Sequence, residues 1–320
     1  MAKYLVTGVA GFIGSHLAHA LVAAGHSVRG LDNFATGLKA NVDELAGSID
    51  FHKVDLRDAT ATAEACRGID VILHQAALPS VPRSVLDPRT SHEANLEGTF
   101  NLLEGARAAG VPRVVYAASS SAYGNQPGFP RVETMAPQPI SPYAVQKLAG
   151  EYYMQSYCRV YGMETVCLRY FNIFGPRQVP DSPYSGVMAK FIAEMLAGRT
   201  PTILGDGEQG RDFTYIDNAV QANLLAATVP AERCAGRVFN VACGERHTLN
   251  QTYAVLCELL EFPHAAHYGP TRPGDVRDSL ADIARAREAL GYKPSVGFRE
   301  GLARTILWYR RQLKQSERSI

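Results

Sequence analysis

Tyr143 and Lys147 stand four residues apart in the segment Ser-Pro-Tyr-Ala-Val-Gln-Lys, a spacing that puts both side chains on one face of a helix. Pro142 suits the first helical position and Ser141 is a suitable N-cap. A phenol with its ordinary pKa of about 10 is a weak base at neutral pH, but a neighbouring ammonium favours the phenolate. The pair therefore indicates proton transfer by Tyr143, assisted by Lys147.

A glycine-rich segment, Thr-Gly-Val-Ala-Gly-Phe-Ile-Gly, directly follows the first apolar run and contains Gly8, Gly11 and Gly14. Such a turn lets the backbone approach a pyrophosphate at the N-terminus of the next helix. Asp32 closes the second expected strand, where a carboxylate accepts hydrogen bonds from an adenosine ribose and repels a 2′-phosphate. The pattern predicts NAD rather than NADP, although glycines and an aspartate also occur in turns without a ligand.

Two further segments follow expected strands. Asp55 and Leu56 come at the end of the third strand and are predicted to line the adenine. Ser119, Ser120 and Ser121 end a later strand, at the sheet edge where open α/β folds bind ligands. One of these hydroxyls could relay a proton or bond a substrate oxygen; spacing alone does not choose among the three, and serine clusters are otherwise typical of turns.

Composition narrows the class of protein. The chain has 320 residues, 46% hydrophobic and 20% charged, with a net charge of +1. Its length suits about two domains of roughly 150 residues each, and the balanced charge argues against a nucleic-acid partner. No apolar stretch is long enough to span a membrane. The expected partner is a small molecule.

Six cysteines are scattered without a C-x-x-C pair, so we predict neither a metal site nor a disulfide framework. Reduced thiols are typical of cytosolic proteins. The first strand is expected to begin at Lys3, which leaves no room for a signal peptide before it. These features predict a cytoplasmic protein.

Short apolar runs alternate with helical stretches in the first half of the chain, which predicts an α/β fold with a doubly wound parallel sheet of the Rossmann type. The expected strands span Lys3 to Thr7, Ser27 to Asp32, Asp50 to Asp55, Asp70 to His74, Arg113 to Ser119 and Glu164 to Arg169. The expected helices span Ile13 to Ala24, Thr90 to Ala109 and Pro142 to Tyr161.

A loop-forming segment rich in proline follows Phe174 and is expected to lead into a smaller, mixed C-terminal domain. We assign residues 1–172 to NAD binding, with approximately 213–244 returning to that domain, and 173–320 mainly to the substrate. The elements expected there are helices near Gly186 to Ala197, Asn218 to Thr228, Leu249 to Leu260 and Arg299 to Lys314, and strands at Thr202 to Leu204 and Val238 to Val241.

Ordered motifs along nearly the whole chain resemble the extended short-chain dehydrogenase/reductases, specifically the nucleotide-sugar epimerases and dehydratases. Besides the glycine turn and Tyr143-x-x-x-Lys147, the matching motifs are His74-Gln-Ala-Ala77, Asn95-Leu-Glu-Gly-Thr99, Ser119-Ser-Ser-Ala-Tyr-Gly124, Leu168-Arg-Tyr-Phe-Asn172 and Gly205-Asp-Gly-Glu-Gln-Gly-Arg-Asp-Phe213. The resemblance implies catalysis by Ser119, Tyr143 and Lys147.

The same resemblance implies binding residues beyond those already named. For the cofactor NAD these are Phe12, Ile13, Asn33, Gln75, Ala76, Ala77, Asn95 and Phe171, together with Ser119, Tyr143 and Lys147. For the substrate they are Ser80, Val81, Ser120, Ser121, Asn172, Val187, Arg211, Arg272, Asp275 and Ser279. Arg211 and Arg272 each offer a planar fork of donors that suits a diphosphate, Asn172 would contact the phosphates, and Asp275 would bind the uridine ribose.

Two positions narrow the implied chemistry. Related dehydratases and decarboxylases carry a glutamate two residues before Tyr123, where this chain has Ser121. Without that acid, we expect oxidation at C4, rotation of the 4-keto sugar and return of the hydride, with no net redox change. Ser279 is a small residue. In the epimerases that this chain resembles and that accept only glucose and galactose, the aligned position is typically bulky and aromatic. The small Ser279 predicts UDP-N-acetylglucosamine and its C4 epimer as substrates besides UDP-glucose and UDP-galactose.

Several alternatives remain open at this point. A UDP-glucuronate 4-epimerase or decarboxylase shares the scaffold, and a regulatory protein that binds NAD without chemistry is a different class. Arg83 either reaches the sugar or pairs with Asp87. The resemblance also implies a homodimer, formed by the helices Thr90 to Ala109 and Pro142 to Tyr161 in a four-helix bundle.

Overall fold

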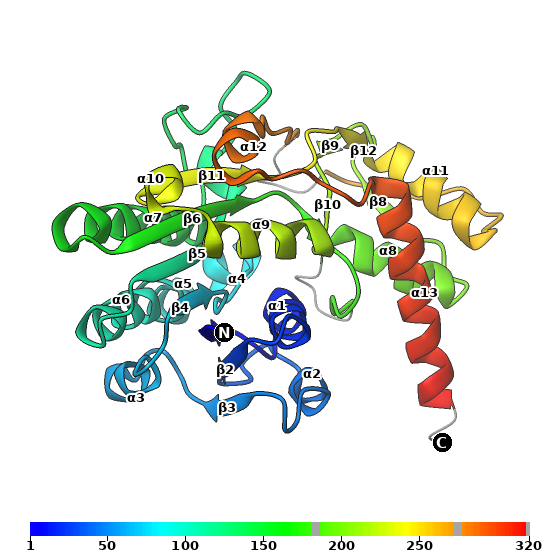
Figure 1. Ribbon diagram of the computed structural model, residues 1–320. Coiled ribbons are helices and arrows are strands. Elements are labelled where there is room, and N and C mark those ends of the chain that lie inside the picture. The colour runs from blue at the N-terminus through cyan, green and yellow to red at the C-terminus, as the bar shows by residue number, and fades with distance from the viewer. Residues whose placement is uncertain (181–185, 272–276, 318–320) are drawn as a thin grey trace.

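The structure is a computed structural model that describes residues 1–180, 186–271 and 277–317 (Figure 1). Within these residues, a seven-stranded parallel sheet forms the centre of the molecule, in the order β11-β6-β5-β4-β1-β2-β3. In chain order the strands are β1 (Lys3–Thr7), β2 (Ser27–Asp32), β3 (Asp50–Lys53), β4 (Val71–His74), β5 (Arg113–Ser119), β6 (Glu164–Tyr170) and β11 (Arg237–Val241).

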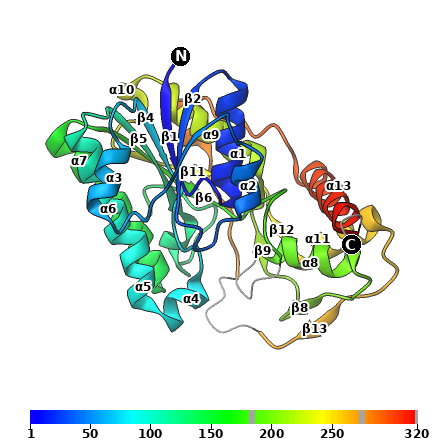
Figure 2. The same cartoon turned by 90° about the horizontal axis from the view of Figure 1, so that it is seen from below.

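Helices cover both faces of this sheet, as Figure 2 shows. One face carries α1 (Phe12–Ala23) and α9 (Ile216–Thr228), and the other carries α3 (Ala59–Ala65), α6 (Gly98–Ala108) and α7 (Pro142–Tyr161). Both layers bury apolar side chains that alternate along the strands, which is what a sheet covered on both faces requires. The predicted α/β fold, a doubly wound sheet of the Rossmann type, is confirmed.

Local chemistry fixes the start and end of α7, the helix that carries Tyr143 and Lys147. The Ser141 side chain accepts a hydrogen bond from the backbone N–H of Ala144 at 3.2 Å, and a proline follows it. At the other end, Gly162 adopts the left-handed conformation at φ 71°, which glycine reaches without steric cost. The sequence therefore defines this helix locally.

The expected helix Thr90 to Ala109 is not one regular α-helix. It begins with α5 (Pro88–His92), passes through a π-helical segment, η1 (Glu93–Glu97), and continues as α6. Side-chain hydrogen bonds account for the irregularity: the Thr99 hydroxyl donates to the carbonyl oxygen of Asn95 at 2.6 Å, and the Asn95 amide binds the backbone of Leu78. The expected strand to Asp55 likewise ends at Lys53.

A smaller unit lies beside the sheet, where α8 (Val187–Leu196), α11 (Leu249–Leu260) and α13 (Phe298–Glu317) surround a separate core (Figure 1). The chain leaves this unit to supply α9 and β11 to the main sheet. Part of the C-terminal segment, α12 (Ala284–Leu290), also packs against the main core through Leu290 and neighbouring side chains. The exact domain bounds stay a prediction.

Short elements complete the described chain. They are α2 (Lys39–Asp43), α4 (Val81–Leu86), η2 (Ser120–Tyr123), α10 (Ala231–Cys234), β7 (Ile173–Phe174), β8 (Thr202–Leu204), β9 (Gly210–Arg211), β10 (Thr214–Tyr215), β12 (His247–Thr248) and β13 (His267–Gly269). All six cysteines carry free thiols. Among the described residues, no helix combines the length and apolar character needed to cross a membrane.

Gly301 joins α13 to the core of the smaller unit and generates a prediction. A Cβ atom there would lie 2.8 Å from the Tyr215 ring and 2.9 Å from the Phe174 ring, both buried. We expect Gly301→Ala to lower the free energy of unfolding by about 1–2 kcal/mol, because overpacking outweighs the gain in helix propensity. Urea unfolding measures the change. Gly297→Ala is the matched control, since nothing lies within 4 Å of its Cβ position.

Candidate active site

A cavity of about 580 Å³ opens at the carboxyl ends of the parallel strands, a volume typical of sites for small molecules. It runs from the glycine turn and Asp32 to Ser119 and Tyr143. The predicted site residues that line it are Gly8, Gly11, Phe12, Ile13, Gly14, Asp32, Asn33, Asp55, Leu56, Gln75, Ala76, Ala77, Ser119, Tyr143 and Asn172. The fold therefore brings most of the predicted cofactor residues to one wall.

Close backbone packing requires glycine in the turn before α1. A Cβ on Gly14 would lie 2.1 Å from the carbonyl oxygen of Gly8, and one on Gly8 would lie 2.8 Å from the backbone nitrogen of Ala76. Gly11 is the N-cap of α1 and offers no side-chain acceptor to the first backbone N–H groups of the helix. The residues of this first turn line the cavity, and a free helix N-terminus suits an anion such as a pyrophosphate.

Asp32 holds the loop after β2 at the far end of the cavity. Its carboxylate accepts hydrogen bonds from the backbone N–H groups of Ala10 at 3.0 Å and Phe34 at 2.7 Å. Burial raises the pKa of Asp32, while these hydrogen bonds oppose the shift. Each carboxylate oxygen retains acceptor capacity, so the side chain suits a ribose hydroxyl.

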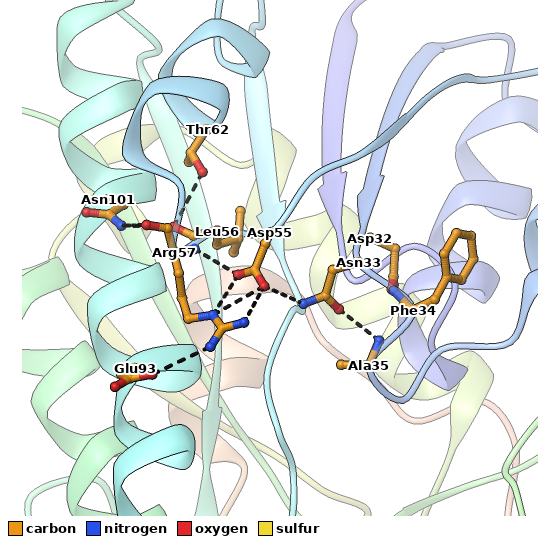
Figure 3. Close-up of polar contacts among 10 residues, drawn as sticks. All are labelled: Asp32, Asn33, Phe34, Ala35, Asp55, Leu56, Arg57, Thr62, Glu93 and Asn101. Carbon is orange, nitrogen blue, oxygen red and sulfur yellow. Dashed lines mark hydrogen bonds and ion pairs between the residues drawn. The ribbon is translucent and has the colours of Figure 1, made fainter.

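Asp55 lies beside this loop in a charged cluster that Figure 3 shows. Arg57 donates to both carboxylate oxygens, with Nε 3.0 Å from Oδ1 and Nη2 2.7 Å from Oδ2. The Asn33 amide also donates to Asp55 at 3.0 Å, and Glu93 lies 3.5 Å from Nη1 of Arg57. The hydrogen bonds from Arg57 hold the pKa of Asp55 well below its usual range.

Arg57 lines the cavity but was not among the predicted site residues. Its spacing from Asp55, two residues along the same loop, was the available signal. The backbone between Asp55 and Arg57 is held in place as well. The carbonyl oxygen of Leu56 accepts hydrogen bonds from Asn101 at 2.9 Å and Thr62 at 3.4 Å (Figure 3). The adenosine end of the predicted cofactor site is thus a preformed, polar wall.

Ser119 and Tyr143 meet at the other end of the cavity. Ser119 and Tyr143 both line the cavity here, and the Ser119 hydroxyl accepts a hydrogen bond from the Ser121 hydroxyl at 2.8 Å. Burial raises the pKa of Tyr143 to about 12, and the Ser119 side chain opposes that rise. Ser84 anchors this end of α7, because its hydroxyl accepts from the backbone N–H of Tyr143 at 3.1 Å. Of the three serines, Ser119 is the one on the cavity wall.

Lys147 lies behind that wall, and its side chain is 3% exposed. The ammonium donates to the carbonyl oxygen of Ala117 at 2.9 Å and lies 4.8 Å from the centre of the Tyr116 ring. Burial lowers the pKa of Lys147 to about 8, and the negative charge of Glu151 opposes the shift. The expected stabilisation of a Tyr143 phenolate by this ammonium stays a prediction.

Tyr170 is a cavity residue that the sequence analysis missed. Its hydroxyl donates to Gln75 at 3.1 Å and accepts from Asn223 at 2.7 Å, and Gln75 donates to Asn223 at 3.1 Å. This closed triangle joins the residue after β4, the end of β6 and α9 beside Ser119, with which Tyr170 pairs in register. The position of Tyr170 at the carboxyl end of a central strand was the signal that could have found it.

The predicted substrate residues Asn172 and Ser279 lie together, although they are far apart in the sequence. The Asn172 amide donates to the Ser279 hydroxyl at 2.9 Å and to the carbonyl oxygen of Asp212 at 3.0 Å. Asp212 follows Arg211 and is fully buried; its carboxylate accepts from the backbone N–H groups of Cys243 at 2.9 Å and Ala281 at 3.1 Å. Burial raises the pKa of Asp212 to about 6.

Asp212 therefore ties together three segments at the junction of the two units. It was missed as an organising residue, and its place in the Gly-Arg-Asp-Phe motif was the only sequence signal. Arg211 itself donates to the backbone oxygens of Gly210 at 2.9 Å and Arg277 at 3.1 Å. Its predicted contact with a diphosphate stays a prediction.

Asn95 and Phe171 do not line the cavity. Asn95 is 1% exposed, and its side-chain oxygen accepts from the backbone N–H of Leu78 at 2.7 Å, so it supports the wall from behind. Phe171 is fully buried in the main core. Their roles in cofactor binding stay predictions.

Several predicted substrate residues also lie off the cavity wall: Ser80, Val81, Ser120, Ser121, Val187, Arg211 and Ser279. Ser80 caps α4, and its hydroxyl accepts from the backbone N–H of Arg83 at 3.0 Å. Arg83 itself lines the cavity, which favours the sugar among its two expected roles. Arg272 and Asp275 lie outside the described residues.

The sequence model of the NAD dependent epimerase/dehydratase family matches residues 4–242 of this chain. The chain belongs to this family, and the predicted family is confirmed. A curated relative, a UDP-glucose 4-epimerase of Mycolicibacterium smegmatis, is 40% identical over 312 residues, which cover 96% of this chain and 98% of the relative.

Solved structures give the same result. A UDP-N-acetylglucosamine 4-epimerase from Methanobrevibacter ruminantium, in complex with UDP-N-acetylmuramic acid, is 37% identical with a TM-score of 0.93 and covers 97% of this chain and 99% of that one. A UDP-glucose 4-epimerase from Thermus thermophilus, in complex with NAD, is 38% identical with a TM-score of 0.88. The match covers 96% of this chain and 99% of that one. These neighbours share both the sheet and the smaller unit.

Proposed function

We propose that this chain is an NAD-dependent UDP-sugar 4-epimerase. The observation that carries the proposal is one cavity with two different ends: a glycine turn at the N-terminus of α1 at one end, and the side chains of Ser119 and Tyr143 at the other. A nucleotide cofactor suits the first end and alcohol oxidation suits the second. Membership of the family and the likeness to UDP-sugar 4-epimerases support the proposal.

The residues of the cavity fit NAD. Gly8, Gly11 and Gly14 line the cavity in a tight turn that suits a pyrophosphate, and Asp32 suits the adenosine ribose and disfavours a 2′-phosphate. Asp55, Asn33 and Leu56 would line the adenine. Bound NAD would supply the acceptor and donor of a hydride.

The remaining chemistry belongs to side chains of this chain. Tyr143 removes the proton of the sugar C4 hydroxyl and later returns it, and Ser119 bridges the substrate oxygen and the phenol. Burial raises the pKa of Tyr143 to about 12, so the base needs positive charge nearby to work at neutral pH. Lys147 supplies such a charge from behind the wall. Because Ser121 stands where an acid would serve elimination, rotation of the 4-keto sugar leads to epimerisation.

Inversion at C4 of the sugar can be observed directly. Purified protein mixed with UDP-glucose should produce inverted C4 signals in NMR spectra without loss of water or CO₂, and Tyr143→Phe should lower turnover about 10²–10⁴-fold while retaining NAD. Tyr161→Phe, on the exposed end of the same helix, is the control and should match the unmodified protein. Unchanged turnover in Tyr143→Phe would remove this residue from the mechanism.

The same NMR measurement is made with UDP-glucuronate as the substrate. If the protein inverts C4 of UDP-glucuronate alone, it is a UDP-glucuronate 4-epimerase. If it releases CO₂ from UDP-glucuronate, it is a decarboxylase. Tight binding of NAD without conversion of any of the sugars would instead identify a regulatory protein.

We propose that both UDP-glucose and UDP-N-acetylglucosamine are substrates, because Ser279 is a small side chain and lies in contact with Asn172, which lines the cavity. Ser279→Tyr should lower kcat/KM for the acetamido sugar at least about tenfold more than for UDP-glucose, the range expected when a pocket loses room for a substituent. The side chain also bonds Asn172, so Ser279→Ala is the control. It removes the hydroxyl but stays small and should leave the ratio of the two substrates unchanged, whereas equal losses in Ser279→Tyr would contradict the pocket assignment.

We further propose a homodimer in the cytoplasm, formed through α6 and α7. These helices expose Phe100 (39%), Val145 (51%) and Tyr152 (54%), side chains that usually mark a contact surface when they cluster. The free thiols suit a reducing compartment.

Light scattering should give twice the chain mass of 34.7 kDa. The double variant Phe100→Glu, Tyr152→Glu should give the chain mass, because charges placed in an apolar interface disfavour association. Leu307→Glu, which changes an exposed side chain of α13, should stay dimeric. A single chain mass for the unmodified protein would refute the dimer.

A further inference from the structure

A buried ion pair lies behind the candidate active site and has no part in the reaction proposed above. Glu151 of α7 is 0% exposed and Arg169 of β6 is 3% exposed. Two parallel hydrogen bonds join them, with Nε 2.9 Å from Oε1 and Nη2 2.7 Å from Oε2. The guanidinium also lies 4.6 Å from the centre of the Tyr123 ring. Buried pairs of this kind seldom add stability over apolar side chains of the same volume, which points to a role other than stability.

The carboxylate of this pair lies next to Lys147. Tyr143, Lys147 and Glu151 follow one another at four-residue spacing along α7, so all three share one face of the helix. Both Lys147 and Glu151 are buried. In a site with little water, a unit charge on one helical turn acts strongly on a charge on the next.

The other titratable side chains around Lys147 carry no charge at neutral pH. Burial lowers the pKa of His74 to about 3 and raises that of Tyr143 to about 12. It also raises the pKa values of Tyr116 and Cys167 well above their ordinary values. Among the described groups facing Lys147 from α7, β4, β5 and β6, Glu151 is the anion, and Arg169 is the cation that holds it.

We propose that Glu151, oriented by Arg169, is a positioning residue whose negative charge keeps the buried Lys147 side chain cationic and thereby sets the alkaline limit of the reaction. The inference rests on the proposed function, in which the charge of Lys147 assists Tyr143. Burial raises the pKa of Glu151, and the hydrogen bonds and positive charge of Arg169 oppose that rise. The ion pair thus transmits a charge to the site without touching substrate or cofactor.

The sign of the effect follows from the burial of the ammonium. Burial already lowers the pKa of Lys147 to about 8 from 10.5, and Glu151 opposes that shift. Without the carboxylate, the ammonium loses its proton at a lower pH. Activity that depends on the charged form should then fall at a lower pH on the alkaline side, while the acid side stays in place.

The test uses the full-length protein with Glu151→Gln. The pH dependence of kcat with UDP-glucose should lose its alkaline half about one pH unit lower than in the unmodified protein, the shift expected from one nearby charge. NMR of protein labelled with ¹³C at the lysine Cε atoms should show the Lys147 signal titrating lower by the same amount, with Lys147→Arg assigning the signal. This second measurement does not require activity, so it separates failure of this inference from failure of the proposed function.

Glu151→Gln leaves Arg169 unpaired and could prevent folding, so the double variant Glu151→Met, Arg169→Met is made alongside it. It removes both charges at similar volume, a change that buried pairs tolerate, and should shift both titrations in the same direction. Glu164→Gln is the matched control, because Glu164 binds Arg113 at 2.8 Å at the amino end of β6, whereas Arg169 lies near the carboxyl end of that strand. Unchanged titrations in the folded double variant, or an equal shift in Glu164→Gln, would overturn the proposal.

Discussion

Parallel pairing of the central strands is the constraint on which the rest of the structure depends. Because every strand of the sheet runs in the same direction, all carboxyl ends meet at one edge, and each connection must cross a face as a helix. The glycine turn follows one strand, Asp32 ends another and Ser119 ends a third. Residues far apart in the sequence therefore share one cavity.

Burial then determines the electrostatics of that cavity. Most titratable groups near Tyr143 are neutral because they lack water, and the few charges that remain are held by specific partners. Lys147 donates a hydrogen bond to a backbone carbonyl, and Glu151 accepts hydrogen bonds from Arg169. Asp212 is the contrasting case, since its carboxylate accepts hydrogen bonds from the backbone N–H groups of Cys243, Gly244 and Ala281. Such groups give the site a fixed geometry before any ligand binds.

Much of the fold could be predicted from the sequence because its signals are local. Ser141 and Pro142 define the start of α7, and apolar runs define the strands to within a few residues. The π-helical segment at Glu93–Glu97 could not be predicted, since it depends on contacts of Asn95 with the distant Leu78. Tyr170 was missed for the same reason, because the distant Gln75 and Asn223 hold its hydroxyl. Arg57 was missed although its main partner, Asp55, is only two residues away.

The sequence by itself determined the class of fold, the glycine turn that suits a pyrophosphate, and the spacing of Tyr143 and Lys147. Helix periodicity, helix caps and the close packing that glycine permits each involve only a few neighbouring residues, so they can be recognised from the sequence. Only the tertiary structure decided that Ser119, rather than its two neighbours, reaches the cavity, and that Asn172 meets Ser279. These contacts form when segments far apart in the sequence pack together and bury their side chains. A pattern of neighbouring residues therefore cannot predict them.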